Sequence, residues 1–172
     1  MADRSDAKAV LVTGAFGVGK TSLIEELAEI FEERGMRYAA IDLDWLCWFD
    51  PGSPDHAAAV PTMLKNVDAV VGNYYETSVR LYALAGVMNS RSDVEDLRAV
   101  LGMPMTTVRL TAPLDEVERR LSASVTTGRQ IDLGVARAWY AQGSNEDIGD
   151  VVIANDGPLR AVALEVLVAL GW

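Results

Sequence analysis

The hydrophobic positions of this chain fall into two kinds of stretch that alternate along it. Short continuous apolar runs are typical of strands buried on both faces of a parallel sheet, whereas apolar residues three and four apart are typical of helices. The strands predicted in this way are residues 9–12, 38–41, 80–86, 106–110 and 151–154. The predicted helices are residues 21–34, 56–78, 93–101, 113–125, 133–142 and 159–170.

This alternation predicts an α/β fold, in which a mainly parallel sheet carries helices on both faces and the crossovers are right-handed. Ligands of such folds bind beyond the carboxyl ends of the strands. Ser92 is the expected N-cap of the third helix, and the turn-forming residues 49–54 predict a loop. The motifs that carry chemistry follow the predicted strands at the carboxyl edge.

A glycine-rich motif joins the first predicted strand to the first helix. It has the pattern G-x-x-x-x-G-K-[ST] and consists of Gly14, Ala15, Phe16, Gly17, Val18, Gly19, Lys20 and Thr21. The glycines allow backbone N–H groups to surround a phosphate, Lys20 supplies a positive charge to the β/γ-phosphates, and the Thr21 hydroxyl is a ligand for Mg²⁺. Strand, loop and helix in this order predict a nucleoside-triphosphate-binding loop.

Two carboxylates follow the second predicted strand. If the strand continues through Asp42 and Asp44, both side chains point to the same side and into one cleft. One acid could then hold Mg²⁺ through water, while the other orients or deprotonates an attacking hydroxyl group. The alternative interpretation is a helix cap or a loop acid.

Aromatic residues come directly after these acids. Trp45 could stack on a ring or a sugar face of a substrate, whereas Trp48 and Phe49 are expected in the core under the loop. Asn73 and Tyr74 could reach the cleft if the second helix leans over it, with an ordinary helix surface as the alternative.

Arginines flank a break at residues 126–129, within a predicted lid at about residues 122–132. Arg129, beside a glycine, is the best placed to stabilise a phosphoryl group in the transition state. Arg119, Arg120 and Arg137 are further candidates, and for each the alternative is a solvated surface charge. Arg91, after the third strand, could face a second substrate or lie on a helix surface.

Composition narrows the partners. The 172 residues are half apolar with a formal net charge of −10, which favours one domain over residues 1–172 and disfavours nucleic acid or an anionic membrane as the partner. No apolar stretch approaches the about 18 residues of a membrane span, and residues 1–12 lack a signal-peptide pattern, so a cytoplasmic location is expected. The lone Cys47 excludes an internal disulfide, and no Cys/His cluster suggests zinc. Oligomeric state is left open.

Missing motifs exclude other classes. The chain has no Asn-Lys-x-Asp guanine signature, and its third strand ends without the acid of large ATPase motors. His56, the only histidine, has no nucleophile partner in the sequence. A regulatory GTPase, an ATPase motor and a serine or cysteine hydrolase are therefore disfavoured.

With these motifs, the sequence resembles the small P-loop kinases related to nucleoside monophosphate kinases, such as the shikimate, gluconate and adenylylsulfate kinases and chloramphenicol phosphotransferase. It looks closest to bacterial adenylylsulfate-kinase-like proteins that share residues 41–46, Asn73-Tyr74 and the terminal Leu170-Gly171-Trp172. The resemblance implies a three-layer α/β/α P-loop NTPase fold with a five-stranded parallel sheet of order 2-3-1-4-5. It also implies that Asp42 supports Mg²⁺, that Asp44 binds the acceptor hydroxyl, and that adenine lies between a lid arginine, here Arg120, and the loop of Asn155.

Two departures from the family pattern stand out. Ser124 occupies a position where relatives often carry a second lid arginine, and the glycine-rich triplet of shikimate kinases is absent after the third strand. Shikimate is therefore disfavoured as the acceptor.

The sequence predicts a kinase that moves the γ-phosphate of MgATP to a hydroxyl of a small metabolite, nucleotide or antibiotic. Lys20, Asp44 and Arg129 would be catalytic, and Thr21 and Asp42 would hold the metal. The residues expected to contact the acceptor are Asp44, Trp45, Asn73, Tyr74 and Arg91. The alternative is an ATP-binding sensor or partner-regulated module that transfers nothing, and a donor other than ATP stays open.

Overall fold

The computed structural model describes residues 3–50, 58–123, 127–143 and 147–172, with residues 127–130 described by their backbone alone. Its centre is a parallel sheet in which β1 (Lys8–Thr13) lies between β3 (Leu81–Ala85) and β4 (Met105–Thr111). The edge strands are β2 (Tyr38–Asp42) and β5 (Val151–Ala154). The strand order is therefore β2-β3-β1-β4-β5, which confirms the predicted order 2-3-1-4-5.

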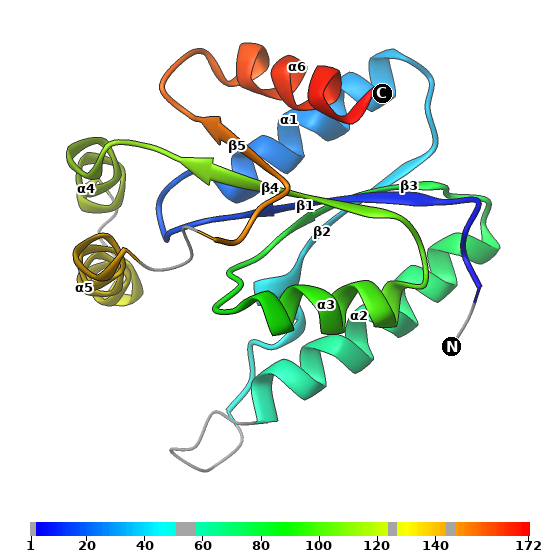
Figure 1. Ribbon diagram of the computed structural model, residues 1–172, viewed down its shortest axis with the longest axis horizontal. Helices are drawn as coiled ribbons and strands as arrows, with labels where there is room; N and C mark the ends of the chain where they lie inside the picture. The colour runs from blue at the N-terminus through cyan, green and yellow to red at the C-terminus, as the bar shows by residue number, and fades with distance from the viewer. Residues whose placement is uncertain (1–2, 51–57, 124–126, 144–146) are drawn as a thin grey trace.

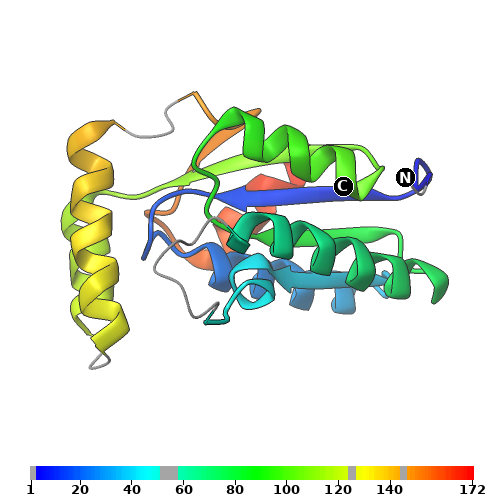
Figure 2. The same ribbon diagram turned by 90° about the horizontal axis from the view of Figure 1, so that it is seen from below.

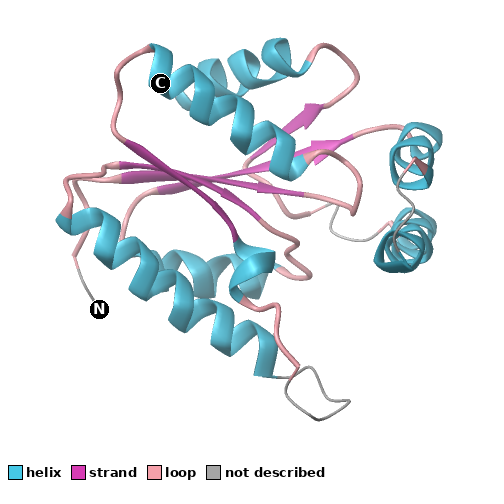
Figure 3. Cartoon of the chain, turned by 180° about the vertical axis from the view of Figure 1, so that it is seen from behind, coloured by secondary structure: helices cyan, strands magenta, loops and turns pink. Residues whose placement is uncertain are grey.

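Helices cover both faces of this sheet (Figures 1 and 3). Helices α1 (Lys20–Glu33) and α6 (Leu159–Leu170) lie on one face, and α2 (Ala59–Glu76) and α3 (Arg91–Leu101) on the other. The predicted three-layer α/β/α architecture is thus confirmed. Within the described ranges, no helix combines the length and the hydropathy that crossing a bilayer requires.

A helical hairpin stands apart from these layers. Helices α4 (Leu114–Ser122) and α5 (Thr127–Gln142) lie beyond the carboxyl ends of the strands, with their axes across the strand direction (Figure 2). The Tyr140 hydroxyl donates to the carbonyl of Ala112 over 2.6 Å, and Arg137 pairs with Glu118 across the hairpin. The hairpin therefore borders the edge at which ligands of this fold bind.

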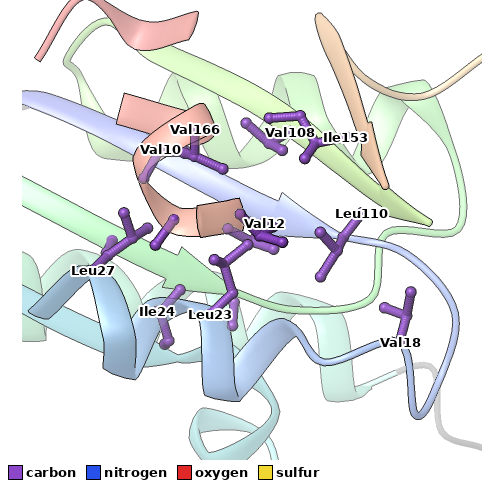
Figure 4. Packing of buried hydrophobic residues seen from close by; sticks show 14 of the residues in the cluster. Val10, Val12, Val18, Leu23, Ile24, Leu27, Val108, Leu110, Ile153 and Val166 are labelled. Atoms are coloured by element: carbon purple, nitrogen blue, oxygen red, sulfur yellow. The ribbon is translucent and has the colours of Figure 1, made fainter. Parts of the chain in front are cut away.

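The core consists of two apolar layers, one on each side of the sheet. Alternate residues of β1 enter different layers, with Val10 and Val12 facing α1 and α6, and Ala9 and Leu11 facing α2 and α3. Figure 4 shows the first layer, where side chains from α1 meet those of the strands and of α6. Burying one large aliphatic side chain stabilises the fold by about 1.5–3 kcal/mol, and the strands read as continuous apolar runs because both faces are covered.

Three local predictions need correction. Helix α5 begins at residue 127 instead of 133, so residues 127–129, predicted as part of a break, are helical. The predicted start of α2 at residue 56 lies outside the described residues, and the described helix begins at Ala59. The N-cap of α3 is Ser90, because its hydroxyl accepts the N–H of Asp93 in a reciprocal capping box, and Ser92 lies inside the helix. A 3₁₀ turn, η1 (Leu43–Leu46), follows β2 where none was predicted. Most of the predicted loop at residues 49–54, with His56 and Ser124, lies outside the described residues.

Candidate active site

The glycine-rich loop connects β1 to α1 and packs tightly on its neighbours. At Gly14 (φ 140°), a Cβ atom would lie 2.4 Å from the carbonyl oxygen of Leu110 in β4. At Gly17 (φ 77°), a Cβ would lie 2.7 Å from the side chain of Leu121 in α4. Glycine is therefore required by both space and backbone conformation at these positions.

Lys20 begins α1 and is almost completely buried, with 7% of its surface exposed. Its ammonium group donates to the carbonyl oxygens of Gly14 and Ala15 over 3.1 and 3.0 Å. A buried cation is costly unless it is hydrogen-bonded or paired with negative charge. The position of this ammonium group at the loop suits the binding of an anionic phosphate.

Thr21 and Asp42 form a second polar pair at the same edge. The Thr21 hydroxyl donates to Oδ2 of Asp42 over 2.7 Å, although β3 lies between β1 and the strand that Asp42 ends. A hydroxyl and a carboxylate at one point suit the oxygen preference of Mg²⁺. Among the described residues no cluster of three or more His, Cys, Asp or Glu could hold a metal, so phosphate and water oxygens would complete its coordination.

Asp44 lies in η1, not on the strand. The other Asp42 oxygen, Oδ1, accepts the N–H of Asp44 over 3.0 Å and so caps this turn. Asp42 is therefore a cap, which was the alternative interpretation, and its role in holding Mg²⁺ stays a prediction. The alternation argument is wrong, because the chain leaves the extended conformation after Asp42, and the cap instead fixes where Asp44 begins.

The surroundings of Asp44 change its proton affinity. Desolvation raises the pKa of its carboxyl group above 3.8, Lys20 acts in the opposite direction, and the negative charge of Asp42 raises the pKa further. The N–H of Val87 lowers the pKa and Asp132 raises it, with smaller effects. Water screens part of the shift, since the residue as a whole is exposed. Asp44 thus lies among the phosphate loop, the segment after β3, and α5.

Arg120 and Asn155 hold the glycine-rich loop from the other side. Arg120 donates to the carbonyls of Val18 and Asn155, each over 3.1 Å, and buried Asn155 donates its side-chain N–H to Val18 over 2.8 Å. Glu116 orients Arg120 through a 2.7 Å hydrogen bond. The structure thus brings the two residues predicted beside adenine together at the loop.

Glu116 itself was missed by sequence reasoning. Arg119 and then Arg120 lower the pKa of Glu116 to about 2, so it is a carboxylate at neutral pH. The signal that could have found it is the spacing of four residues between Glu116 and Arg120 on a predicted helix.

The aromatic residues after Asp44 are exposed. Trp45 and Trp48 are 67% and 75% exposed and contact each other with ring centroids 4.8 Å apart. Phe49 is also exposed, so the prediction that Trp48 and Phe49 lie in the core is wrong. The turn η1 carries the aromatic side chains outward instead of under the loop. Contact of Trp45 with an acceptor stays a prediction.

Asn73 and Tyr74 are placed at the opposite edge of the sheet from the loop. Both lie near the end of α2, which leads into the start of β3. The next residue, Tyr75, donates its hydroxyl to Asp6, which precedes β1. Because α2 runs antiparallel to the strands, only its first turns approach the carboxyl edge. The structure therefore does not bring Asn73 and Tyr74 to the cleft, which corrects that expectation.

The remaining arginines have different positions. Arg91 donates to the carbonyl of Asp147 over 3.0 Å at the start of α3, and its contact with an acceptor stays a prediction. Arg119 pairs with Glu116 on the surface of α4, and Arg137 ties α5 to α4. The backbone of Arg129 lies in the first turn of α5, and its side chain lies outside the described residues.

Comparisons with known proteins agree with this geometry. A family model for an AAA domain matches residues 10–148, which include the loop, both aspartates and the hairpin. One similar solved structure is the adenylylsulfate (APS) kinase of Mycobacterium tuberculosis in complex with AMPPNP and APS, with 19% identity, coverage of 98% of this chain and 99% of that chain, and a TM-score of 0.66. The tunicamycin resistance protein of Deinococcus radiodurans has 22% identity, 96% coverage of each chain and a TM-score of 0.63. A sugar kinase from a Janibacter species has 18% identity, coverage of 96% and 95%, and a TM-score of 0.64.

Comparison with curated protein sequences gave no match. The structural similarities concern the fold, and they confirm the predicted resemblance to small P-loop kinases at that level.

Proposed function

This chain belongs to the AAA domain family, and on that basis we propose that it is a phosphotransferase that moves the γ-phosphoryl group of MgATP to a hydroxyl group of a small molecule. The observation that carries the proposal is Asp44, a second carboxylate beside the phosphate loop with a raised pKa. A loop that only bound nucleotide would need Lys20 and Thr21 but no further acid at this point. A kinase needs a group that accepts the proton of the attacking hydroxyl.

The proposed roles follow from the contacts. Lys20 and the loop N–H groups would bind the β- and γ-phosphates. Thr21 and Asp42 would hold Mg²⁺, which would neutralise charge on the phosphates. Asp44 accepts the hydroxyl proton as the acceptor oxygen bonds to the γ-phosphorus. The bond from that phosphorus to the bridging oxygen breaks, and ADP leaves.

The adenine and lid roles rest on α4 and α5. Arg120 and Asn155, held at Val18, would lie beside the adenine ring. Arg129, at the start of α5, would close over the transferring phosphoryl group.

A raised pKa supports the role of Asp44 as base, since a carboxylate with higher proton affinity is the better proton acceptor.

Names of the similar structures support a small-molecule acceptor but not one chemical class. They include an APS kinase, a sugar kinase and a tunicamycin resistance protein. We therefore propose a hydroxylated small molecule as the acceptor and leave its identity to a direct screen.

The test is mass spectrometry of a pool of metabolites and antibiotics incubated with the protein and MgATP. We expect a new phosphate on a component with the wild-type protein only, and no product with Lys20→Ala, because the variant lacks the cation for the β/γ-phosphates. A product formed equally by Lys20→Ala would refute the proposal.

A second variant separates transfer from binding. Asp44→Asn keeps the shape of the side chain and should lose transfer by about 10²-fold or more while it still binds MgATP. An unchanged transfer rate would remove Asp44 from the mechanism. Tight ATP binding by the wild-type protein, with no acceptor effect across a broad pool, would favour the sensor or partner-regulated module.

A further inference from the structure

Arg109 is a charged residue within the central strand β4 and has no role so far. It pairs in register with Thr13 of β1 and Val152 of β5. The Thr13 hydroxyl accepts the N–H of Met88, from the loop between β3 and α3. Register partners on neighbouring strands face the same side of a sheet, so Arg109 lies with Thr13 on the face covered by α2 and α3.

One donor of the half-buried Arg109 side chain lacks the kind of partner that other poorly exposed arginines have. Its Nε atom is buried and makes no hydrogen bond within the described part of the chain. The other arginines with little exposure each donate to several groups: the side chains of Arg4, Arg98 and Arg120 are at most 29% exposed and are all paired. A buried donor without a partner destabilises a protein, so its presence calls for a ligand or a function.

Nearby groups do not fill this role. Gly149 contacts Arg109, and the next residue along the chain is the acid Asp150. Oδ2 of Asp150 already accepts hydrogen bonds from Arg98 over 2.6 Å and from the N–H of Thr107 over 2.7 Å. Gly149 itself has φ 131°, and a Cβ there would lie 2.8 Å from the Cβ of Arg109. The absence of a side chain at residue 149 therefore leaves space for the Arg109 side chain, and the Asp150 carboxylate is hydrogen-bonded to other groups.

Arg109 is also close to the proposed transfer site. Thr13, its register partner, directly precedes Gly14 of the phosphate loop, and adjacent strands are about 4.8 Å apart. Residue 88, which contacts Thr13, follows Val87, whose N–H interacts with the Asp44 carboxyl group. The loop after β3 thus connects Asp44 to the strand position beside Arg109.

We propose that Arg109 binds an anionic group of the acceptor, so that the phosphorylated molecule carries a carboxylate, sulfate or phosphate group besides its hydroxyl. A guanidinium binds such oxyanions with two parallel hydrogen bonds, and the buried Nε of Arg109 would donate one of them with little competition from water. The identification of the bound molecule as the acceptor rests on the proposed function. Binding of an anion at Arg109 can be tested without phosphoryl transfer.

The first test measures anion binding by calorimetry. Protein saturated with MgAMPPNP, which occupies the phosphate loop, is titrated with sodium sulfate and, separately, with sodium acetate. We expect Arg109→Met to weaken binding of the preferred anion about tenfold or more, and Arg109→Lys to retain part of it. Arg160→Gln, which removes a surface arginine of α6 that pairs with Glu26 of α1, should bind like the wild type. Equal binding by Arg109→Met, or no binding of either anion by the wild type, would overturn the inference. The stronger of the two anions tells a tetrahedral oxyanion from a carboxylate.

Unfolding experiments separate this role from a structural one. If Arg109 serves to bind a ligand, Arg109→Met should not be less stable than the wild type in the absence of anions. The variant should unfold at the same or a higher temperature, because the substitution removes an unsatisfied donor. A clearly lower unfolding temperature would indicate that Arg109 stabilises the fold instead.

The acceptor screen distinguishes failure of this inference from failure of the proposed function. Phosphorylation of a neutral acceptor with a KM unchanged in Arg109→Met would overturn the inference and leave the kinase intact. An anion site that depends on Arg109, in a protein that phosphorylates nothing, would sustain the site and reject the kinase.

Discussion

Replacing glycine by alanine should change the free energy of unfolding differently at three positions: Gly19 in the glycine-rich loop, Gly35 after α1 and Gly134 in α5. Gly19 has φ 103°, and a Cβ there would lie 2.5 Å from Nδ2 of Asn155. That amide cannot simply move away, because Asn155 is buried and donates to Val18 over 2.8 Å. Gly19→Ala therefore combines backbone strain with the loss of a buried hydrogen bond.

The magnitudes follow from these two costs. A left-handed conformation costs an alanine about 1–2 kcal/mol, and leaving a buried polar group unpaired costs about 1–3 kcal/mol. Gly19→Ala should lower the free energy of unfolding by about 2–5 kcal/mol. Gly35 has φ 64° and no atom within 4 Å of its Cβ position, so Gly35→Ala should lose only the backbone cost of about 1–2 kcal/mol. Gly134 lies inside α5 with open space around it. Gly134→Ala should therefore raise the free energy of unfolding by about 0.5–1 kcal/mol.

The assay is urea unfolding without nucleotide, followed by circular dichroism. Gly19→Ala should also be non-additive with Asn155→Ala, because the clash disappears once the amide is gone. If Gly19→Ala costs no more than Gly35→Ala, or if the two substitutions simply add, Asn155 does not hold the loop and the reasoning fails.

Two further predictions concern the acids of the site. Because desolvation raises the pKa of Asp44 in the folded protein, the contribution of Asp44 to stability should fall as pH rises through the interval above 3.8. Asp44→Asn should therefore gain stability relative to the wild type across that interval and be the more stable of the two at neutral pH. Urea unfolding of both proteins at several pH values checks this difference, and a variant less stable than the wild type at neutral pH would contradict it. Burial, followed by the charges of Asp44 and Asp42, raises the pKa of Cys47 above 9.0, so its alkylation by iodoacetamide at about pH 8 should be slower than in the unfolded chain and faster in Asp44→Asn; an equal rate in the variant would place the thiol away from that carboxylate.

The sequence was sufficient for the fold because its signals are local and consistent. Apolar runs between helical stretches specify a parallel sheet covered on both faces, and the glycines between Gly14 and Thr21 adopt positive φ values that other residues rarely adopt. The strand order came from the family resemblance, since hydrophobic patterns do not tell which strands are neighbours.

Details of the site could not be predicted because they depend on tertiary contacts. The pattern Asp42-Leu43-Asp44 suits a strand end as well as a turn, and only the cap formed by Asp42 decides for the turn. The helical pattern around Tyr74 would be the same whichever edge of the sheet this residue approached. The direction of α2 places Tyr74 away from the loop. The charge of Arg109 within a mostly apolar interior strand is a signal that sequence analysis could have used, as is the spacing between Glu116 and Arg120.

One carboxylate organises both reactive groups of the proposed site. Oδ2 of Asp42 accepts the Thr21 hydroxyl hydrogen, which leaves the lone pairs of that hydroxyl for a cation. Oδ1 of the same residue accepts the N–H of Asp44 and fixes the turn from which the second acid projects. The negative charge of Asp42 also raises the pKa of Asp44. A cation bound at Thr21 and Asp42 would reduce that last effect, because it neutralises the charge responsible for it. The proton affinity of the proposed base is therefore coupled to occupancy of the metal position through Asp42, in addition to any direct effect of the cation on Asp44.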